Sequence, residues 1–82
     1  MLFNLARLFE QLHDTKKANL LYRLILFKFP DYVDAYLRLA AMAQARNEIQ
    51  LSLELIGEAL KVDKTSVNVI TMLGNLELKI DD

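Results

Sequence analysis

The feature that most constrains the fold is a recurrence of residue types every 34 positions along the 82-residue chain. Four series of apolar or small residues keep this step: Leu2, Tyr36 and Ile70; Leu5, Leu39 and Leu73; Ala6, Ala40 and Gly74; and Leu8, Met42 and Leu76. A second group does the same: Ala18 and Ser52, Tyr22 and Ile56, and Leu26 and Leu60. A fixed period of this length indicates stacked copies of one supersecondary unit.

Within each unit, the apolar residues have helical spacing. Five stripes with this spacing follow one another: Leu2, Leu5, Ala6, Phe9 and Leu12; Ala18, Leu21, Tyr22, Ile25 and Phe29; Tyr36, Leu39, Ala40 and Ala43; Leu53, Ile56, Ala59 and Leu60; and Ile70, Leu73 and Gly74. The chain has only two glycines and one proline, so it lacks the turn residues that β-hairpins need. The sequence therefore predicts an all-α fold of five helices.

The segments between the stripes carry helix boundary signals. Asp14 or Thr15 can cap the second helix, because a short oxygen side chain accepts from the free amides of a first turn. Pro30 ends that helix, because the residue before a proline avoids the helical region, and Asp31 is placed to begin the next one. Asn47 tolerates a left-handed backbone and so suits the turn before the fourth helix.

Small residues recur where two helices of a pair would come closest. Ala6, Ala40 and Gly74 hold this place in the first helix of each unit, and Ala18 and Ser52 hold it in the second. Because protein interiors are densely packed, a small side chain on both helices permits a close antiparallel approach. The recurring unit is therefore expected to be a tightly packed pair of helices.

This pattern resembles the tetratricopeptide (TPR) repeat, W-x2-L-G-x2-Y…A-x3-F…P. The resemblance implies a right-handed solenoid fragment of two and a half repeats, with repeats at 1–32 and 33–66 and the first helix of a third at 67–82. The sequence departs from the pattern at Lys64, where proline is expected, and at Glu77, where a large apolar residue is expected.

Composition narrows the range of functions. The net charge is -1, so a nucleic-acid surface is not expected, and no apolar run approaches the roughly 18 residues that span a bilayer. Cysteine is absent, which excludes disulfides and thiolate metal sites, and no cofactor motif is present.

His13 is the only histidine, and we interpret it as a turn residue rather than a base or ligand. Glu10, Glu54 and Glu58 are expected on a solvated face, and the chain is predicted not to be an enzyme.

In a TPR stack, the first helix of each repeat lines a concave groove. The residues predicted to bind a partner there are Phe3, Asn4, Arg7, Arg38, Gln44, Met72 and Asn75. The guanidinium groups of Arg7 and Arg38 could donate hydrogen bonds to a partner's carboxylate or carbonyl, or they could be solvated or bridge repeats. The groove lacks the lysine and asparagine set with which some TPR proteins hold chaperone tails.

A closer resemblance is to the large TPR-rich subunit of the polymerase-associated factor complex, which acts with RNA polymerase II in transcription elongation. It rests on one stretch most of all: Pro30, Tyr32, Val33, Asp34, Tyr36, Leu37, Arg38, Leu39, Met42 and Ala43. The departures are Ala40, where glycine is more usual, and the turn at 46–50. The resemblance implies a nuclear scaffold that binds other subunits of the complex and helps couple elongation to histone modification.

Two other classes remain open on the sequence alone. A generic TPR adaptor of the co-chaperone type would use the same groove to bind peptide segments. An obligate helical dimer, or part of an enzyme, is the other.

The chain reads as an excerpt of a longer solenoid, and the apolar residues Val69, Leu76 and Ile80 are expected to lack a partner helix within it. The isolated fragment is therefore expected to self-associate.

Overall fold

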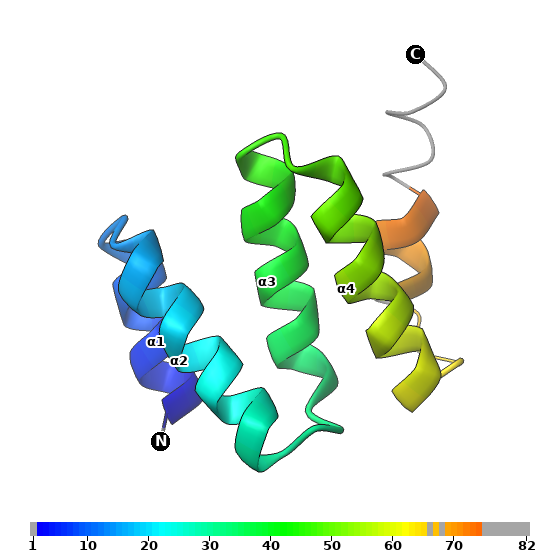
Figure 1. Cartoon of the computed structure of the whole chain (residues 1–82), viewed down its shortest axis with the longest axis horizontal. Coiled ribbons are helices and arrows are strands. Elements are labelled where there is room, and N and C mark those ends of the chain that lie inside the picture. Colours follow the sequence, from blue (N-terminus) through cyan, green and yellow to red (C-terminus); the bar gives the residue numbers. More distant parts are fainter. Residues whose placement is uncertain (1, 66, 68, 75–82) are drawn as a thin grey trace.

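The structure, a computed structural model, describes residues 2–65, 67 and 69–74. Four helices are complete within these residues: α1 (Leu2–Gln11), α2 (Thr15–Lys28), α3 (Val33–Ala45) and α4 (Ile49–Val62) (Figure 1). Residues 67 and 69–74 are also helical, and none of the described residues forms a strand. The prediction of an all-α fold is confirmed.

The 34-residue recurrence is present in the backbone. α2 and α4 are both 14 residues long, and their first residues are 34 positions apart. The turns before them contain the two non-glycine residues of positive φ in the described chain, His13 (φ 63°) and Asn47 (φ 64°), again 34 apart. The prediction of a left-handed Asn47 and the interpretation of His13 as a turn residue are confirmed.

Both turns end the preceding helix with the same pair of hydrogen bonds. After α1, the His13 N–H donates to the Glu10 carbonyl (3.1 Å) and the Asp14 N–H donates to the Phe9 carbonyl (2.9 Å). The pair recurs after α3, from Asn47 to Gln44 (3.0 Å) and from Glu48 to Ala43 (2.8 Å). This is a Schellman motif, which satisfies the last carbonyls of a helix and requires one left-handed residue.

The helix starts agree with the sequence only in part. Asp14 caps α2 as predicted, because its Oδ1 accepts a hydrogen bond from the Lys17 N–H (3.3 Å). The prediction that Asp31 begins the next helix was wrong. α3 begins at Val33 after Tyr32, whose side chain makes no capping hydrogen bond.

The second helix of each hairpin ends at the same place by different means. α2 ends at Lys28, and Phe29 leaves the helical region directly before Pro30, as predicted. In the second hairpin no proline is present, and α4 ends at the equivalent position. There the carboxylate of Asp63 accepts hydrogen bonds from the N–H (3.1 Å) and hydroxyl (2.9 Å) of Thr65, which closes a local turn.

The small residues lie where the helices of each pair approach most closely. Ala6, Ala18, Ala40 and Ser52 are all fully buried. The Ser52 hydroxyl donates to the backbone carbonyl of Ala40 at 3.1 Å, so the two small positions of the second hairpin are in direct contact. Gly74 differs from this prediction, because it is exposed and a Cβ added to it would meet no atom within 4 Å.

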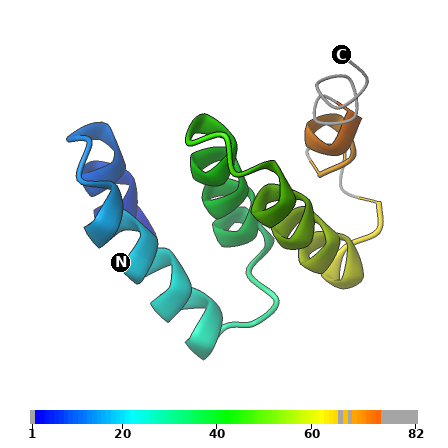
Figure 2. The ribbon, with the colours of Figure 1, turned by 45° about the horizontal axis from the view of Figure 1, so that its top comes forward.

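The two hairpins stack side by side, and α2 packs against α3 to join them (Figures 1 and 2). One apolar cluster runs through both hairpins, and its largest fully buried side chains are Tyr22, Leu39, Ile56 and Val69. Burial of Val69 contradicts the expectation that it lacks a partner. Leu76 and Ile80, named with it, lie outside the described residues. The continuous core is what a helical-repeat fragment requires, because each hairpin buries its apolar face against the next.

Besides Gly74, four residues of the predicted stripes are exposed: Leu5, Leu12, Phe29 and Ile70. The pair Leu5 and Leu39 shows why. Leu39 is 2% exposed because α2 packs against α3, whereas no described helix packs against the corresponding face of α1, and Leu5 is 42% exposed. Helical spacing predicts a face correctly, but burial of that face depends on the neighbouring hairpin.

Candidate functional site

A groove runs along the first helices of the successive hairpins. Its cavity has a volume of about 450 Å³ and is lined by residues of α1, α3 and the helical residues 69–74: Phe3, Arg7, Asp34, Leu37, Arg38, Gln44, Thr71 and Met72. The structure thus brings together five of the seven residues predicted to bind a partner. Asn4 is exposed on α1 but does not line the cavity, and Asn75 lies outside the described residues. Binding by these residues stays a prediction.

Aromatic rings fix the position of Phe3 at one end of the groove. The Phe3 ring meets the Tyr22 ring edge to face, with centroids 5.7 Å apart, and the Tyr32 ring at 5.4 Å. Such pairs are worth about 0.5–1.5 kcal/mol beyond the area that they bury. Tyr22 is fully buried in α2, so Phe3 offers the groove a rigid apolar surface supported by the core.

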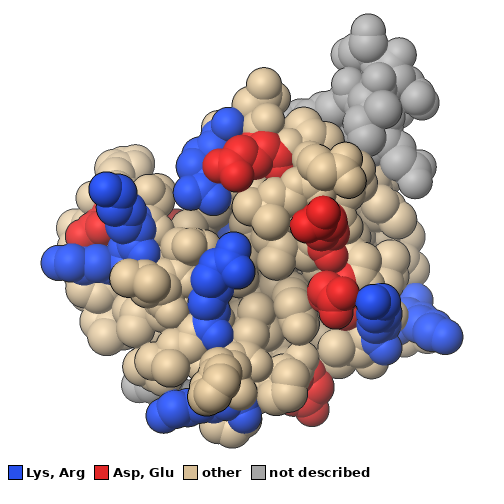
Figure 3. Space-filling model, in the orientation of Figure 1, with Lys and Arg blue, Asp and Glu red and all other residues tan. Residues whose placement is uncertain are grey.

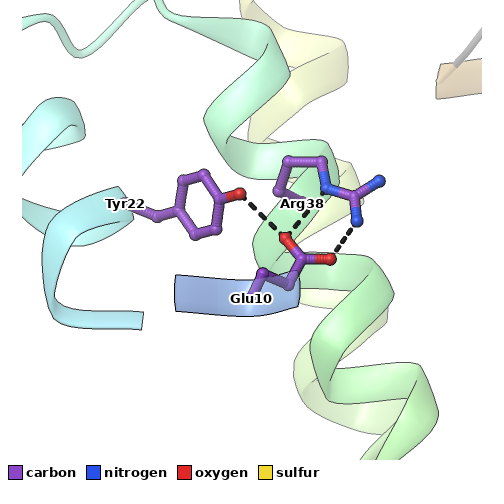
Figure 4. A network of polar contacts seen from close by, with 3 residues as sticks. All are labelled: Glu10, Tyr22 and Arg38. Carbon is purple, nitrogen blue, oxygen red and sulfur yellow. Dashed lines mark hydrogen bonds and ion pairs between the residues drawn. The ribbon is translucent and has the colours of Figure 1, made fainter. Parts of the chain in front are cut away.

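A polar network joins three helices beside the groove (Figure 4). Glu10 of α1 accepts at Oε1 from the Tyr22 hydroxyl (2.8 Å) and from Arg38 Nε (3.2 Å), while its Oε2 pairs with Arg38 Nη2. The prediction of a solvated Glu10 was wrong. The sequence contains one indication of a buried polar contact, because a buried tyrosine hydroxyl needs a hydrogen-bond partner. It does not indicate which residue is that partner.

The network shifts the pKa of each member. Partial burial raises the pKa of Glu10, but the hydrogen bonds from Arg38 and Tyr22 and the charges of Arg38 and Arg7 together lower it below its usual range. Burial, followed by the hydrogen bond to Glu10, raises the pKa of Tyr22 to about 12. The hydrogen bond to Glu10 raises the pKa of Arg38 despite the opposing effect of burial. At neutral pH the three groups are therefore carboxylate, phenol and guanidinium.

The same network separates the roles of the two groove arginines. Arg38 bridges the first and second hairpins, which is one of the alternatives that the sequence left open. Arg7 forms no hydrogen bond or ion pair with the described residues, although its charge acts on Glu10. Arg7 is therefore the groove cation that can donate to an incoming carboxylate or carbonyl.

Comparison with known proteins shows which sequences this chain resembles. No protein-family model matches the chain. The Protein CTR9 homolog of Arabidopsis thaliana is 62% identical to it over 81 residues, which is 99% of the chain. The chain is homologous to a segment of CTR9. The RNA polymerase-associated protein CTR9 of Caenorhabditis elegans is 34% identical over 74 residues, or 90% of the chain. The chain spans 7% of the first CTR9 protein and 6% of the second.

The other titratable residues singled out in the sequence lie outside the groove. His13 is an exposed turn residue, and Glu54 and Glu58 are exposed on α4 as expected, with Glu58 paired to Lys61 (3.1 Å). The described residues contain no group of three or more histidine and acidic side chains that could hold a metal ion. No helix in the same part of the chain combines the length and hydropathy needed to cross a membrane.

Proposed function

We propose that the chain is a scaffold segment of the polymerase-associated factor complex, which acts with RNA polymerase II during transcription elongation and in the histone modification linked to it. The observation that carries this proposal is the 62% identity to a CTR9 protein over nearly the whole chain. The nucleus is the corresponding location, the other subunits of the complex are the partners, and the segment contributes no catalysis. Neither a nucleic acid nor a membrane is a direct partner in this proposal.

We further propose that the fold is a right-handed TPR solenoid, with repeats at 1–32 and 33–66 and a third beginning at 67. Two observations support this architecture: the backbone recurs with the 34-residue step, and the small positions Ala40 and Ser52 are in contact. Stacked hairpins leave the first helices on one side, where they form an extended surface for a partner.

The groove suits an extended segment of a partner protein. Phe3 and Met72 provide apolar contact at two places, and Arg7 and Gln44 provide hydrogen-bond donors in the same cavity. A segment with apolar side chains and one carboxylate directed at Arg7 would satisfy this arrangement. Binding through side-chain pockets and main-chain hydrogen bonds is the ordinary mode for an extended peptide.

The proposal is tested by affinity capture of the full-length parent protein followed by mass spectrometry. The unmodified protein should retain the subunits of the elongation complex, and Arg7→Glu combined with Met72→Glu should lose at least one of them. Lys64→Ala, in the turn after α4, is the matched control and should retain them all. Capture of chaperones instead, through acidic C-terminal tails and in a manner that depends on Arg7, would favour the co-chaperone type of adaptor.

The isolated chain is also proposed to self-associate through the exposed face of α1 that contains Leu5 and Leu8. The equivalent residues of α3, Leu39 and Met42, are buried against the preceding hairpin, so a second copy could cover Leu5 and Leu8 in the same manner. Sedimentation of the isolated chain should show dimers that Leu5→Gln with Leu8→Gln removes. A wild-type chain that stays monomeric at high concentration would contradict this.

A further inference from the structure

The outer face of α2 exposes three large apolar side chains, Leu20, Leu24 and Phe27. They lie at positions i, i+4 and i+7, so they form one stripe along the helix, opposite the buried Ala18, Tyr22 and Ile25. Phe27 is 85% exposed, which leaves nearly the whole ring in water. We name these three residues the α2 outer stripe.

Comparison with α4 shows that stacking of hairpins does not account for the stripe. The residues 34 positions later are Glu54, Glu58 and Lys61, and all three are exposed. The second hairpin packs against α2 on one side and shares its core with Val69 on the other, yet this face of α4 stays in solvent. A further hairpin stacked in the same manner would thus leave the α2 outer stripe uncovered.

α2 and α4 also differ in charge at equivalent positions. α2 contains four basic residues and no acidic one: Lys16, Lys17, Arg23 and Lys28. The residues at the equivalent places in α4 are uncharged: Gln50, Leu51, Gly57 and Val62. Lys17 pairs with Asp14 (3.6 Å), whereas Lys16, Arg23 and Lys28 form no ion pair with the described residues. Figure 3 shows mainly basic side chains over α2 and acidic ones over α4 on the same face.

We propose that the α2 outer stripe docks an acidic amphipathic helix of a partner protein. Lys16, Leu20, Arg23 and Phe27 share one row of the helix, so basic groups flank the apolar side chains along the stripe. A partner helix with leucine-like residues at the same spacing would cover the stripe, and carboxylates beside them would pair with the basic groups. This surface lies outside the groove, so it is separate from the proposed function.

Two other occupants fit the surface less well. An anionic membrane is flat and would also meet the acidic side chains over α4 on the same face (Figure 3), which places like charges against each other. A second copy of the chain could present its own α2 outer stripe, but this pairing would bring the basic residues Lys16, Arg23 and Lys28 of the two copies together without any acidic residue of α2 to offset them. The other helix that it could present, α4, has Glu54, Glu58 and Lys61 where apolar residues are needed. A separate helix that runs along α2 avoids both difficulties.

The experiment titrates the isotope-labelled chain with a synthetic 21-residue helical peptide that carries leucine on one face and glutamate beside it. Chemical shifts should change along α2, and the affinity should weaken as salt is added, because exposed charges are screened. The key variant combines Leu20→Glu, Leu24→Glu and Phe27→Lys, which gives α2 the residues of α4. It should weaken binding at least about tenfold, as expected when central apolar anchors are lost.

Three controls keep the test decisive. Leu8→Gln removes an exposed apolar side chain of α1 that lies outside the cavity shared by Leu5 and Leu20, and it should bind the peptide like wild type. A peptide with lysine in place of glutamate should bind at least about tenfold more weakly. If the key variant does not fold by circular dichroism, Lys16→Gln, Arg23→Gln and Lys28→Gln together replace it and should lower affinity at low salt.

Several results would overturn the proposal. These are no shift changes with the acidic peptide, equal binding of the lysine peptide, or unchanged binding by the key variant. Tighter binding to phosphatidylserine vesicles than to the peptide would assign the surface to a membrane. Loss of self-association in the key variant alone would assign it to a second copy of the chain.

Discussion

The ion pair between Glu10 and Arg38 provides a quantitative test of how the two hairpins are joined. The residues 34 positions later are Gln44 and Met72, so the chain itself suggests the substitutions Glu10→Gln and Arg38→Met. Glutamine keeps the size of glutamate and an oxygen that can accept from Tyr22. The substitution therefore removes the charge and leaves most of the packing intact.

The magnitude follows from burial. Breaking a fully buried pair costs about 3–5 kcal/mol, whereas an exposed pair is worth about 0.2–1 kcal/mol. The side chains of Arg38 and Glu10 are 32% and 19% exposed, so each single variant should lose about 1–2.5 kcal/mol of unfolding free energy. The double variant should lose less than the sum by about 1 kcal/mol, because neither charge is then left unpaired.

The assay is urea unfolding of the four proteins at neutral pH, followed by far-ultraviolet circular dichroism. For a domain of this size, each kcal/mol should also shift the melting temperature by about 4–8 °C. Losses that add to within about 0.3–0.5 kcal/mol would refute the argument, because they would show no coupling between the two side chains.

Three further predictions follow from the same structure. Because the pKa of Glu10 is lowered on folding, its contribution to stability is complete above the ordinary glutamate range and is lost as the pH falls below that range. Urea unfolding at a series of pH values should therefore show that the unfolding free energy of Glu10→Gln falls less steeply with acid than that of wild type. His13→Gly should raise the melting temperature and add about 0.5–1 kcal/mol to the free energy of unfolding, because φ is 63° at this residue. Asn47→Gly should add less, because asparagine tolerates the left-handed region better than histidine does. Equal increases for the two variants would contradict this reasoning. Gly57→Ala should stabilise α4 by up to about 1 kcal/mol in thermal unfolding, because a Cβ there meets no atom within 4 Å, and a lower melting temperature would show hidden crowding.

Local signals in the sequence predicted most of the fold. The helices, the cap at Asp14, the stop at Pro30 and the left-handed Asn47 each depend on a few adjacent residues, and each is confirmed. The placement of the groove was also predictable, because helical spacing decides which residues of a first helix share a face. Five residues predicted for the groove do line one cavity.

What could not be predicted depends on how one hairpin sits on the next. Glu10 is 12 residues from Tyr22 and 28 from Arg38, and only the packing of α1, α2 and α3 brings the three together. The exposure of Leu5 has the same origin, since its equivalent Leu39 is buried by a neighbouring hairpin. A periodic pattern gives the repeating unit, but it does not describe differences between successive junctions.

The polar network beside the groove belongs to the first junction alone within the described residues, because Gln44, Ile56 and Met72 stand at the corresponding places of the next. The two joints of this segment therefore differ in mechanical character. Bending or pulling at the first must break charged hydrogen bonds, which rupture abruptly over a short distance. The second has no ion pair at the corresponding place among the described residues, so it should yield to an applied load before the first.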